Sequence, residues 1–197
     1  MIEFGSVKMK NIIRMEQIHG NKVSFVGKKD KGTIIKKCDG LLTDDPEVVL
    51  SLRVADCLPI FMYSPTTNSI GLIHAGWRGL YKGIINKAIL ALNKKFGTKA
   101  EDINIFIGPH ICQKHYEVKN DVAEKFEQYP KALKKVRSKT HLDLGKVAKD
   151  QLIKSGINKD KIKFDRQCTF ENKNLNSYRR GDLLARTDYL FRLPDSS

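Results

Sequence analysis

Two histidines and one cysteine stand where strands are expected to end. His19 is followed directly by a Gly-Asn turn, His74 ends the apolar stretch "SIGLIHA", and Cys57 lies in "RVADCLPI", where Pro59 interrupts strand pairing. Side chains at strand ends and turns can converge on one spot. Two imidazoles and a thiolate form a set that holds Zn²⁺ with a fourth position open for water or substrate. These three residues are therefore the candidate ligands of a catalytic metal.

A structural role for the same residues remains open. The ligand spacing is 38 residues from His19 to Cys57 and 17 from Cys57 to His74, which matches no local zinc signature. A histidine at a strand end is often held by hydrogen bonds alone, and a cysteine beside an apolar run is often plain core. Spacing by itself therefore leaves both interpretations standing.

The residues after His74 favour an anion. "GWRGL" places two glycines and Arg78 at the start of a helical pattern, where free N–H groups and the helix dipole attract negative charge. The Arg78 guanidinium suits a phosphate or a carboxylate. In the alternative interpretation, Gly76 and Gly79 only permit a tight strand-to-helix turn, with Trp77 capping the core.

The elements that would position these residues alternate along one chain. Runs of β-branched and aromatic residues predict strands at 22–26, 47–55, 58–64, 69–75, 103–108 and 161–165. Helical periodicity predicts helices at 80–97, ending at Gly97, at 120–129 behind an Asn or Asp cap, and at 142–156, closed by Gly156. The pattern predicts a single α/β (α+β layered) domain over 1–197, with strands dominating the first half.

Composition narrows the class of protein. With 197 residues, 41% of them hydrophobic, the chain suits one globular core, and no apolar run approaches the roughly 20 residues that cross a bilayer. The four cysteines are widely spaced, without a C-x-x-C pair, which suits a reducing compartment. We therefore expect a soluble cytoplasmic protein without a membrane partner.

The formal charge of +14 admits a polyanionic partner. It comes from 36 Lys and Arg against 22 acidic residues, and the lysines are spread along the chain without interleaved aromatic residues. Such lysines usually form solvated faces, so a nucleic-acid partner is not expected, whereas a phosphate-bearing substrate is compatible with the charge.

Seven segments resemble a known family. "QIHGNKV", "CDGLLTD", "SLRVADCLPIFMY", "IGLIHAGWRGL", "IGPHI…YEV", "HLDL" and "CTF…SYRRG" occur in the order expected of YfiH-like proteins, historically labelled laccase-domain or polyphenol oxidase proteins. The resemblance runs from about residue 17 to 187, and ADC-x-P combined with HAGWRG is highly specific. It implies a single layered α/β domain with mixed sheets flanked by helices, and a zinc site made by His19, Cys57 and His74.

The resemblance also implies an activity. Members look like cytoplasmic purine nucleoside enzymes that phosphorolyse adenosine, inosine and methylthioadenosine and deaminate adenosine, and a peptidoglycan-editing role is attached to bacterial relatives. Phosphorolysis needs a phosphate beside the ribose, for which Arg78 is the first candidate, with Arg179 and Arg180 behind it. Deamination needs a proton carrier, for which Asp39 and Asp56 are candidates. Asp56 can share a site with Cys57 only if the chain kinks between them.

The chain departs from the family pattern in several places. About sixteen residues precede Gln17, where members carry a longer region with a Gly-rich, Arg-containing segment of the pocket. Lys114 and His115 replace the usual cysteines before "YEV", and Ala185 and Arg186 stand in place of Gly-Arg. A second metal cluster of His110, Cys112 and His115 is conceivable, but a surface loop is the preferred interpretation. Cys38 and Cys168 are read as ordinary thiols, and His141 as a helix-start or core residue.

Three functions remain in competition. The first is a zinc-dependent purine nucleoside phosphorylase with adenosine deaminase activity. The second is a copper-dependent polyphenol oxidase, although five histidines are too few for a multicopper cluster and nothing in the sequence positions Met62 as an axial ligand. The third is a non-catalytic basic module that binds nucleic acid or a protein partner. The sequence does not indicate an oligomeric state.

Overall fold

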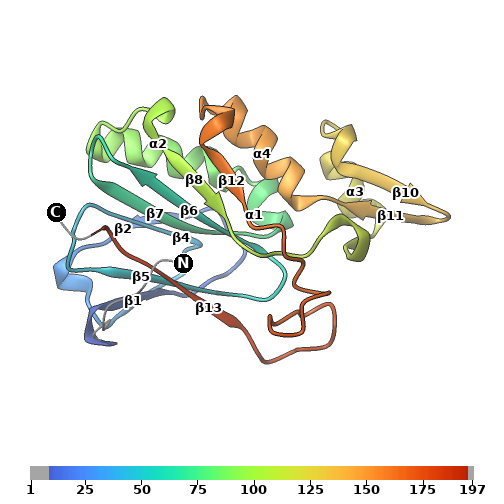
Figure 1. Cartoon of the computed structure of the whole chain (residues 1–197), viewed down its shortest axis with the longest axis horizontal. Coiled ribbons are helices and arrows are strands. Elements are labelled where there is room, and N and C mark those ends of the chain that lie inside the picture. The colour runs from blue at the N-terminus through green and yellow to red at the C-terminus, as the bar shows by residue number, and fades with distance from the viewer. Residues whose placement is uncertain (1–8, 195–197) are drawn as a thin grey trace.

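The computed structural model describes residues 9–194 of the chain. Helices α2 (Ile84–Phe96) and α4 (Leu144–Lys154) cover one face of a six-stranded sheet, and a four-stranded sheet covers the other face (Figure 1). A three-stranded sheet stands to one side of these layers beside the short helix α3 (Asn120–Ala123). The expected layered α/β fold with mixed sheets flanked by helices is confirmed.

The six-stranded sheet forms the middle layer. Its strand order is β12-β8-β6-β7-β4-β2, with parallel pairing only at the two edges. Its strands are β2 (Val23–Phe25), β4 (Gly40–Thr43), β6 (Leu58–Ser64), β7 (Ser69–Ala75), β8 (Asn104–Ile107) and β12 (Ile162–Phe164). All seven residues of β7 are buried, because both faces of this central strand are covered.

The residues of β7 alternate between two cores. Ile73 and Ala75 pack with the helices, while Ile70 and Leu72 pack against the four-stranded sheet. His74 therefore shares the face of Ile70 and Leu72, so its side chain is directed to the layer between the two sheets.

The four-stranded sheet has the order β13-β5-β1-β3. Its strands are β1 (Ile12–Met15), β3 (Ile34–Ile35), β5 (Val49–Val54) and β13 (Thr187–Phe191). The sequence predicted β5 but missed β1, β3 and β13, which are short and show no sustained alternation. The chain passes from β5 in this sheet to β6 in the other across 55–57, the segment that contains Cys57.

The helices differ in part from expectation. The predicted helix over 80–97 is two helices, α1 (Trp77–Tyr81) and α2, because Gly83 takes a left-handed conformation (φ 75°) between them. Gly97 does end α2, as predicted, and its N–H donates to the Asn93 carbonyl. The anion-binding helix start expected at "GWRGL" thus opens a helix of five residues rather than the long one.

The second half holds more strand than expected. Strands β9 (Glu117–Val118), β10 (Leu133–Val136) and β11 (Lys139–Leu142) form the third sheet, and His141 lies in β11 rather than at a helix start. The helix predicted over 120–129 reduces to α3 and a following 3-10 turn, and Lys119 at its N-cap provides no side-chain cap. The helix predicted over 142–156 is α4, which starts at Leu144 because Leu142 belongs to β11, and the Asp143 carboxylate caps it by accepting the Lys146 N–H.

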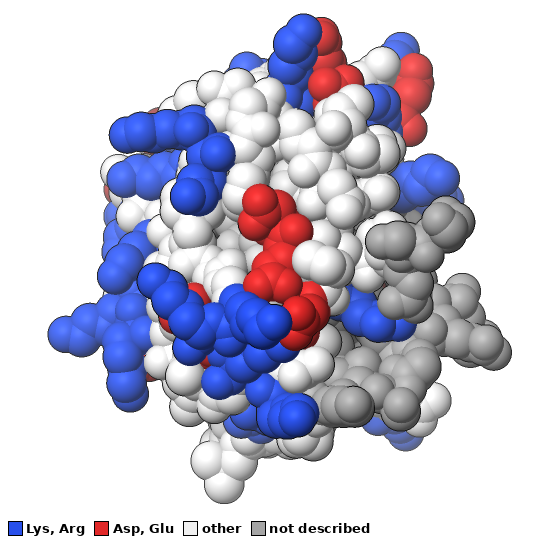
Figure 2. Space-filling view, turned by 90° about the vertical axis from the view of Figure 1, so that its left-hand side faces the viewer, with Lys and Arg blue, Asp and Glu red and all other residues white. Residues whose placement is uncertain are grey.

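Charge on one end of the molecule is mixed (Figure 2). On the end of the molecule shown in Figure 2, basic side chains stand in separate groups around a strip of acidic and uncharged residues. No helix among residues 9–194 is long and apolar enough to cross a membrane.

Candidate metal centre and adjoining pocket

The three candidate metal ligands meet at one end of the layer between the sheets. One ligand atom from each of His19, Cys57 and His74 lies within 4.8 Å of the other two. The two imidazole rings stand edge to face with centroids 4.8 Å apart. The structure therefore brings together residues that are 17 and 38 positions apart in the sequence.

Asp39 positions two of these ligands, His19 and His74, through hydrogen bonds. It is fully buried just before β4. Its Oδ1 accepts the His19 N–H at 2.9 Å and contacts Nδ1 of His74 at 2.8 Å, and its Oδ2 accepts the N–H groups of Gly20 at 2.7 Å and Ile18 at 3.3 Å. The carboxylate thereby sets the His74 ring so that Nε2 is the nitrogen left for a metal.

Backbone strain at His19 is offset by the same carboxylate. His19 has a φ of 57°, in the left-handed region that costs a non-glycine residue free energy. The consecutive N–H groups of Ile18, His19 and Gly20 all converge on Asp39, which satisfies three donors at once. Gln17 anchors the same loop, because its side-chain amide pairs with both the N–H and the carbonyl of Arg53.

A kink delivers Cys57 to the site. Asp56 has a φ of 86°, so the chain turns between Asp56 and Cys57 as the shared-site interpretation required. The Asp56 side chain is nevertheless engaged: Oδ1 accepts the Thr169 hydroxyl at 2.6 Å and Oδ2 accepts the Arg179 N–H at 2.7 Å. These bonds connect the kink to the loop after β12.

Electrostatics in the cluster favour a cation. Burial raises the pKa of the Cys57 thiol, but the charge of His74 and the hydrogen bond from His19 outweigh it and lower the pKa to about 6. Burial lowers the pKa of His74, yet the Cys57 charge and the Asp39 hydrogen bond raise it to about 9. At neutral pH a Cys57 thiolate therefore faces a protonated His74, and a borderline-soft divalent ion such as zinc would take the place of that proton, held by the thiolate and two imidazoles.

Gly76 keeps the centre of the cluster open. A Cβ at this position would lie 2.8 Å from Cys57 Sγ and 3.3 Å from His19 Cδ2. The backbone of Gly76 has a φ of −79°, which any residue adopts. The requirement for glycine is therefore steric rather than conformational.

A Gly76→Ala variant is expected to fold and to lose the metal, because the added methyl group occupies the space between two ligands. Zinc content and the thermal melting curve measure the two effects. Gly83→Ala is the matched control: Gly83 has a φ of 75° with nothing within 4 Å of a Cβ, so this change should cost about 1 kcal/mol of stability and leave metal content unaltered. Unchanged zinc content in Gly76→Ala would contradict the placement of the ion.

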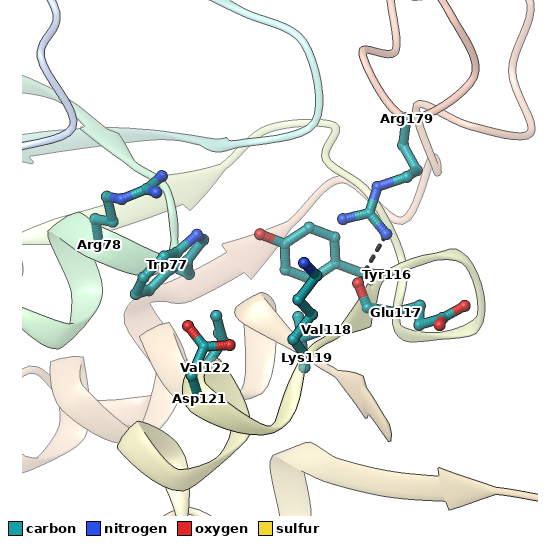
Figure 3. A pocket seen from close by; sticks show the side chains of 9 residues that line it. All are labelled: Trp77, Arg78, Tyr116, Glu117, Val118, Lys119, Asp121, Val122 and Arg179. Carbon is teal, nitrogen blue, oxygen red and sulfur yellow. Dashed lines mark hydrogen bonds between the residues drawn. The ribbon is translucent and has the colours of Figure 1, made fainter. Parts of the chain in front are cut away.

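A pocket of about 460 Å³ adjoins the end of the sandwich, on the side of α1 and β9 (Figure 3). Aromatic and basic side chains face each other across it, and the Tyr116 hydroxyl points toward Trp77. Burial and the nearby Cys57 charge raise the pKa of Tyr116, which therefore stays protonated at neutral pH. Nine residues line the pocket: Trp77, Arg78, Tyr116, Glu117, Val118, Lys119, Asp121, Val122 and Arg179.

The three candidate arginines have different environments. Arg78 lies with its guanidinium 4.4 Å from the Trp77 ring centroid, and Arg179 lies 4.9 Å from that of Tyr116 and donates to the Glu117 carbonyl. Both line the pocket. Arg180 instead donates to loop carbonyls, including that of Thr169, and pairs with Asp182. Its guanidinium is therefore committed to holding the loop.

Sequence reasoning did not single out most of the pocket. Tyr116 and Glu117 were visible only as part of "YEV", and Trp77 was read as a core cap. Lys119 and Asp121 follow β9 at the start of the helix predicted over 120–129, where nothing in the sequence marked them as pocket residues. Only the contact of this segment with α1 and Arg179 makes these residues a wall.

The fold and site define a class: a layered α/β protein with a candidate mononuclear metal centre beside a pocket of aromatic and basic residues. The chain belongs to the multi-copper polyphenol oxidoreductase laccase family, whose model matches residues 2–186. The YfiH-like resemblance of the sequence motifs is thereby confirmed.

Two similar proteins are named as purine nucleoside phosphorylases rather than as laccases. The chain is 32% identical over 172 residues to purine nucleoside phosphorylase YlmD of Bacillus subtilis and 33% identical over 138 residues to a purine nucleoside phosphorylase of Bacteroides thetaiotaomicron. These matches cover 81% and 67% of this chain. The chain spans only 62% and 51% of the length of these two relatives.

Two solved structures share the fold. The hypothetical protein YfiH of Bacillus licheniformis matches with a TM-score of 0.90 at 28% identity, covering 95% of this chain and 76% of the other. YlmD of Geobacillus stearothermophilus matches with a TM-score of 0.90 at 27% identity, covering 96% and 76%.

Proposed function

We propose that the chain is a zinc-dependent purine nucleoside phosphorylase that acts on adenosine, inosine and methylthioadenosine in the cytoplasm and also deaminates adenosine. The observation that carries the proposal is the convergence of His19, Cys57 and His74 at the end of the sandwich that the pocket adjoins. The names of the relatives support the substrate class.

The metal and the chain would divide the work. His19, Cys57 and His74 would hold zinc, which would supply Lewis-acid chemistry at this end of the pocket. Trp77 and Tyr116 offer ring faces for a purine, and Arg78 with Arg179 offers guanidinium groups for phosphate. Asp121 offers a carboxylate for ribose hydroxyls. These groups would hold phosphate and nucleoside in a reactive orientation.

The two aspartates have positioning roles in this account. Both Asp39 oxygens hold the His19 loop and His74, and both Asp56 oxygens hold the loop that contains Thr169 and Arg179. Neither carboxylate has an oxygen without a hydrogen bond to serve as a proton carrier. Tyr116, whose raised pKa keeps its proton, is a pocket group that can donate a hydrogen bond to the departing base.

Arg78→Ala is expected to raise the KM for phosphate by roughly 10- to 100-fold, since a charged hydrogen bond contributes about 1.5–3 kcal/mol. The zinc content should not change, because Arg78 is no ligand. Phosphate saturation curves at fixed inosine measure the effect. Arg53→Ala is the control, because Arg53 is an exposed residue paired with Asp188 outside the pocket. Equal phosphate KM values for Arg78→Ala and wild type would contradict the assignment.

The activity is tested by chromatography of adenosine and inosine reactions with and without inorganic phosphate. Base released only when phosphate is present, together with ribose 1-phosphate, supports phosphorolysis. Inosine formed from adenosine supports deamination. No base from either nucleoside would overturn the proposal.

Copper chemistry is the second candidate, because the family model describes a laccase. A His₂Cys site for electron transfer favours a weak axial methionine. Met62 is fully buried in the helix-side core and pairs with Gly71, three residues along β7 from His74 and therefore about 10 Å away. Met62 is thus unsuited to an axial position, and the first proposal is favoured.

The non-catalytic basic module is disfavoured by the distribution of charge. Basic groups in Figure 2 are interrupted by acidic residues instead of forming one continuous stripe. Several lysines are paired with carboxylates, such as Lys28 and Lys31 with Glu47. We therefore propose small molecules, not nucleic acid, as the partners.

A further inference from the structure

A second group of metal-ligating side chains lies outside the candidate centre. Sγ of Cys112, Sγ of Cys168 and a carboxylate oxygen of Glu171 lie within 4.8 Å of one another. Both thiols are free. The sequence grouped Cys112 with two histidines, whereas the structure pairs it with Cys168, 56 residues further along the chain.

Each cysteine opens a tight turn that returns a second ligand three residues later. The His115 N–H donates to the Cys112 carbonyl at 3.1 Å, and the Glu171 N–H donates to the Cys168 carbonyl at 3.1 Å. The turns therefore present Cys-x-x-His and Cys-x-x-Glu. Cysteine and histidine are the usual ligands of structural zinc, and a glutamate oxygen is a further ligand that zinc accepts.

The two turns already face each other. His110 and Cys168 form a parallel bridge, and the Cys112 N–H donates to Cys168 Sγ at 3.2 Å, the type of bond that metal-bound sulfur receives. Nε2 of His115 lies 2.9 Å from Glu171 Oε1. The His115 ring stacks on Phe170 with centroids 4.2 Å apart, which fixes its orientation. Cys112, Cys168 and Glu171 thus need little rearrangement, whereas His115 adjoins them through Glu171 and must move closer to the two thiols.

The dimensions suit a tetrahedral ion. Zinc bonds of about 2.0–2.3 Å place neighbouring ligand atoms roughly 3.3–3.8 Å apart. For Cys112, Cys168 and Glu171 the observed limit of 4.8 Å therefore requires a contraction of about 1 Å, and His115, which lies outside this set, requires a larger movement. Among residues 9–194, the side-chain contacts of Glu171 all go to Oε1, so Oε2 is available for the ion.

We propose that Cys112, His115, Cys168 and Glu171 form a second, structural site for a zinc-class divalent cation. The ion would join the segment that contains Tyr116 to the loop that contains Arg179, and so fix two walls of the pocket. Lys114 disfavours cation binding at this site, because its ammonium group lies 3.1 Å from Glu171 Oε1 and already pairs with that carboxylate. The Lys114 side chain is exposed, so it can turn away when a cation binds.

The test isolates this site in a Cys57→Ser protein, in which the first site is disabled, and needs no activity assay. Equilibrium dialysis with zinc should give one bound ion per chain in Cys57→Ser and none in Cys57→Ser/Cys112→Ser. Cobalt(II) should give a thiolate charge-transfer band in the single variant only. Zinc should also raise the melting temperature of Cys57→Ser.

Two exposed positions act as matched variants that keep the fold. In the Cys57→Ser background, Glu171→Gln should weaken zinc binding by at least about 10-fold, because a ligand loses its negative charge. Lys114→Ala should strengthen zinc binding, because it removes a competing positive charge. Circular dichroism verifies folding. No stoichiometric zinc in folded Cys57→Ser, equal binding after Cys112→Ser, or loss of both thiols to a disulfide would overturn the proposal.

Discussion

A His74→Ala variant is expected to lose the catalytic metal and at least about 10³-fold in kcat/KM for phosphorolysis, because a bound metal contributes several kcal/mol to the transition state. His74 is nearly fully buried and is the ligand that Asp39 orients, so no neighbouring side chain replaces it. Zinc analysis and initial rates with inosine and phosphate measure the two losses.

The control for His74→Ala is His141→Ala. His141 lies in β11 and contacts the Gln113 carbonyl, outside the cluster of His19, Cys57 and His74. The His141→Ala variant should therefore keep its zinc at the first site and should still release base from inosine. Full activity in metal-free His74→Ala would contradict a catalytic role for the ion.

Asp39→Asn is expected to lower the free energy of unfolding by about 3 kcal/mol, since Asn offers one acceptor oxygen where the carboxylate satisfies four buried or partly buried donors. It should also weaken zinc binding by roughly 10- to 100-fold, because the His74 ring loses its orienting carboxylate. Urea unfolding and zinc titration measure these effects.

The stability difference should depend on pH. Burial raises the pKa of the Asp39 carboxyl, but hydrogen bonds from His74 and the Gly20 N–H outweigh it and hold the pKa below its ordinary value of 3.8. A depressed pKa in the folded state means that the carboxylate contributes its full stability above about pH 4 and loses it as the pH falls through the folded-state value. The wild type and Asp39→Asn curves should therefore converge in acid.

Glu47→Gln serves as the control for Asp39→Asn. Lys31 and Lys28 lower the pKa of Glu47 to about 2, but this carboxylate is exposed and its ion pairs are screened by solvent. Its loss should change stability far less than Asp39→Asn does. A larger effect at Glu47 would contradict the importance given to burial.

Long buried strands were predictable from sequence, and so were the short strands β2 and β12, whereas β1, β3 and β13 were not. β6 and β7 match their predicted ranges residue for residue, because most of the seven positions in each strand are apolar and give a clear pattern. β1 has four residues and β3 two, and each is held in the sheet by pairing with neighbours that sequence periodicity cannot reveal. The break at Gly83 was missed because the apolar stripe continues across it.

The candidate metal ligands were predictable from sequence because histidine and cysteine have distinctive chemistry. The hydrogen bonds by which Asp39 and Asp56 position the site were not predictable. Histidine and cysteine at strand ends pointed to His19, Cys57 and His74. The four-bond role of Asp39 depends on a left-handed turn at His19, and the role of Asp56 depends on Thr169, more than a hundred residues away. Such contacts follow from tertiary pairing, which the residue types do not encode locally.

The most direct test of a metal-dependent phosphorylase is to strip the wild-type protein with a chelator and add back zinc or copper separately. The account predicts that phosphate-dependent base release from inosine disappears on stripping and returns with zinc. It also predicts that copper supports no oxygen uptake with a phenolic substrate. Base release that persists without metal, or oxygen uptake by the copper form, would contradict it.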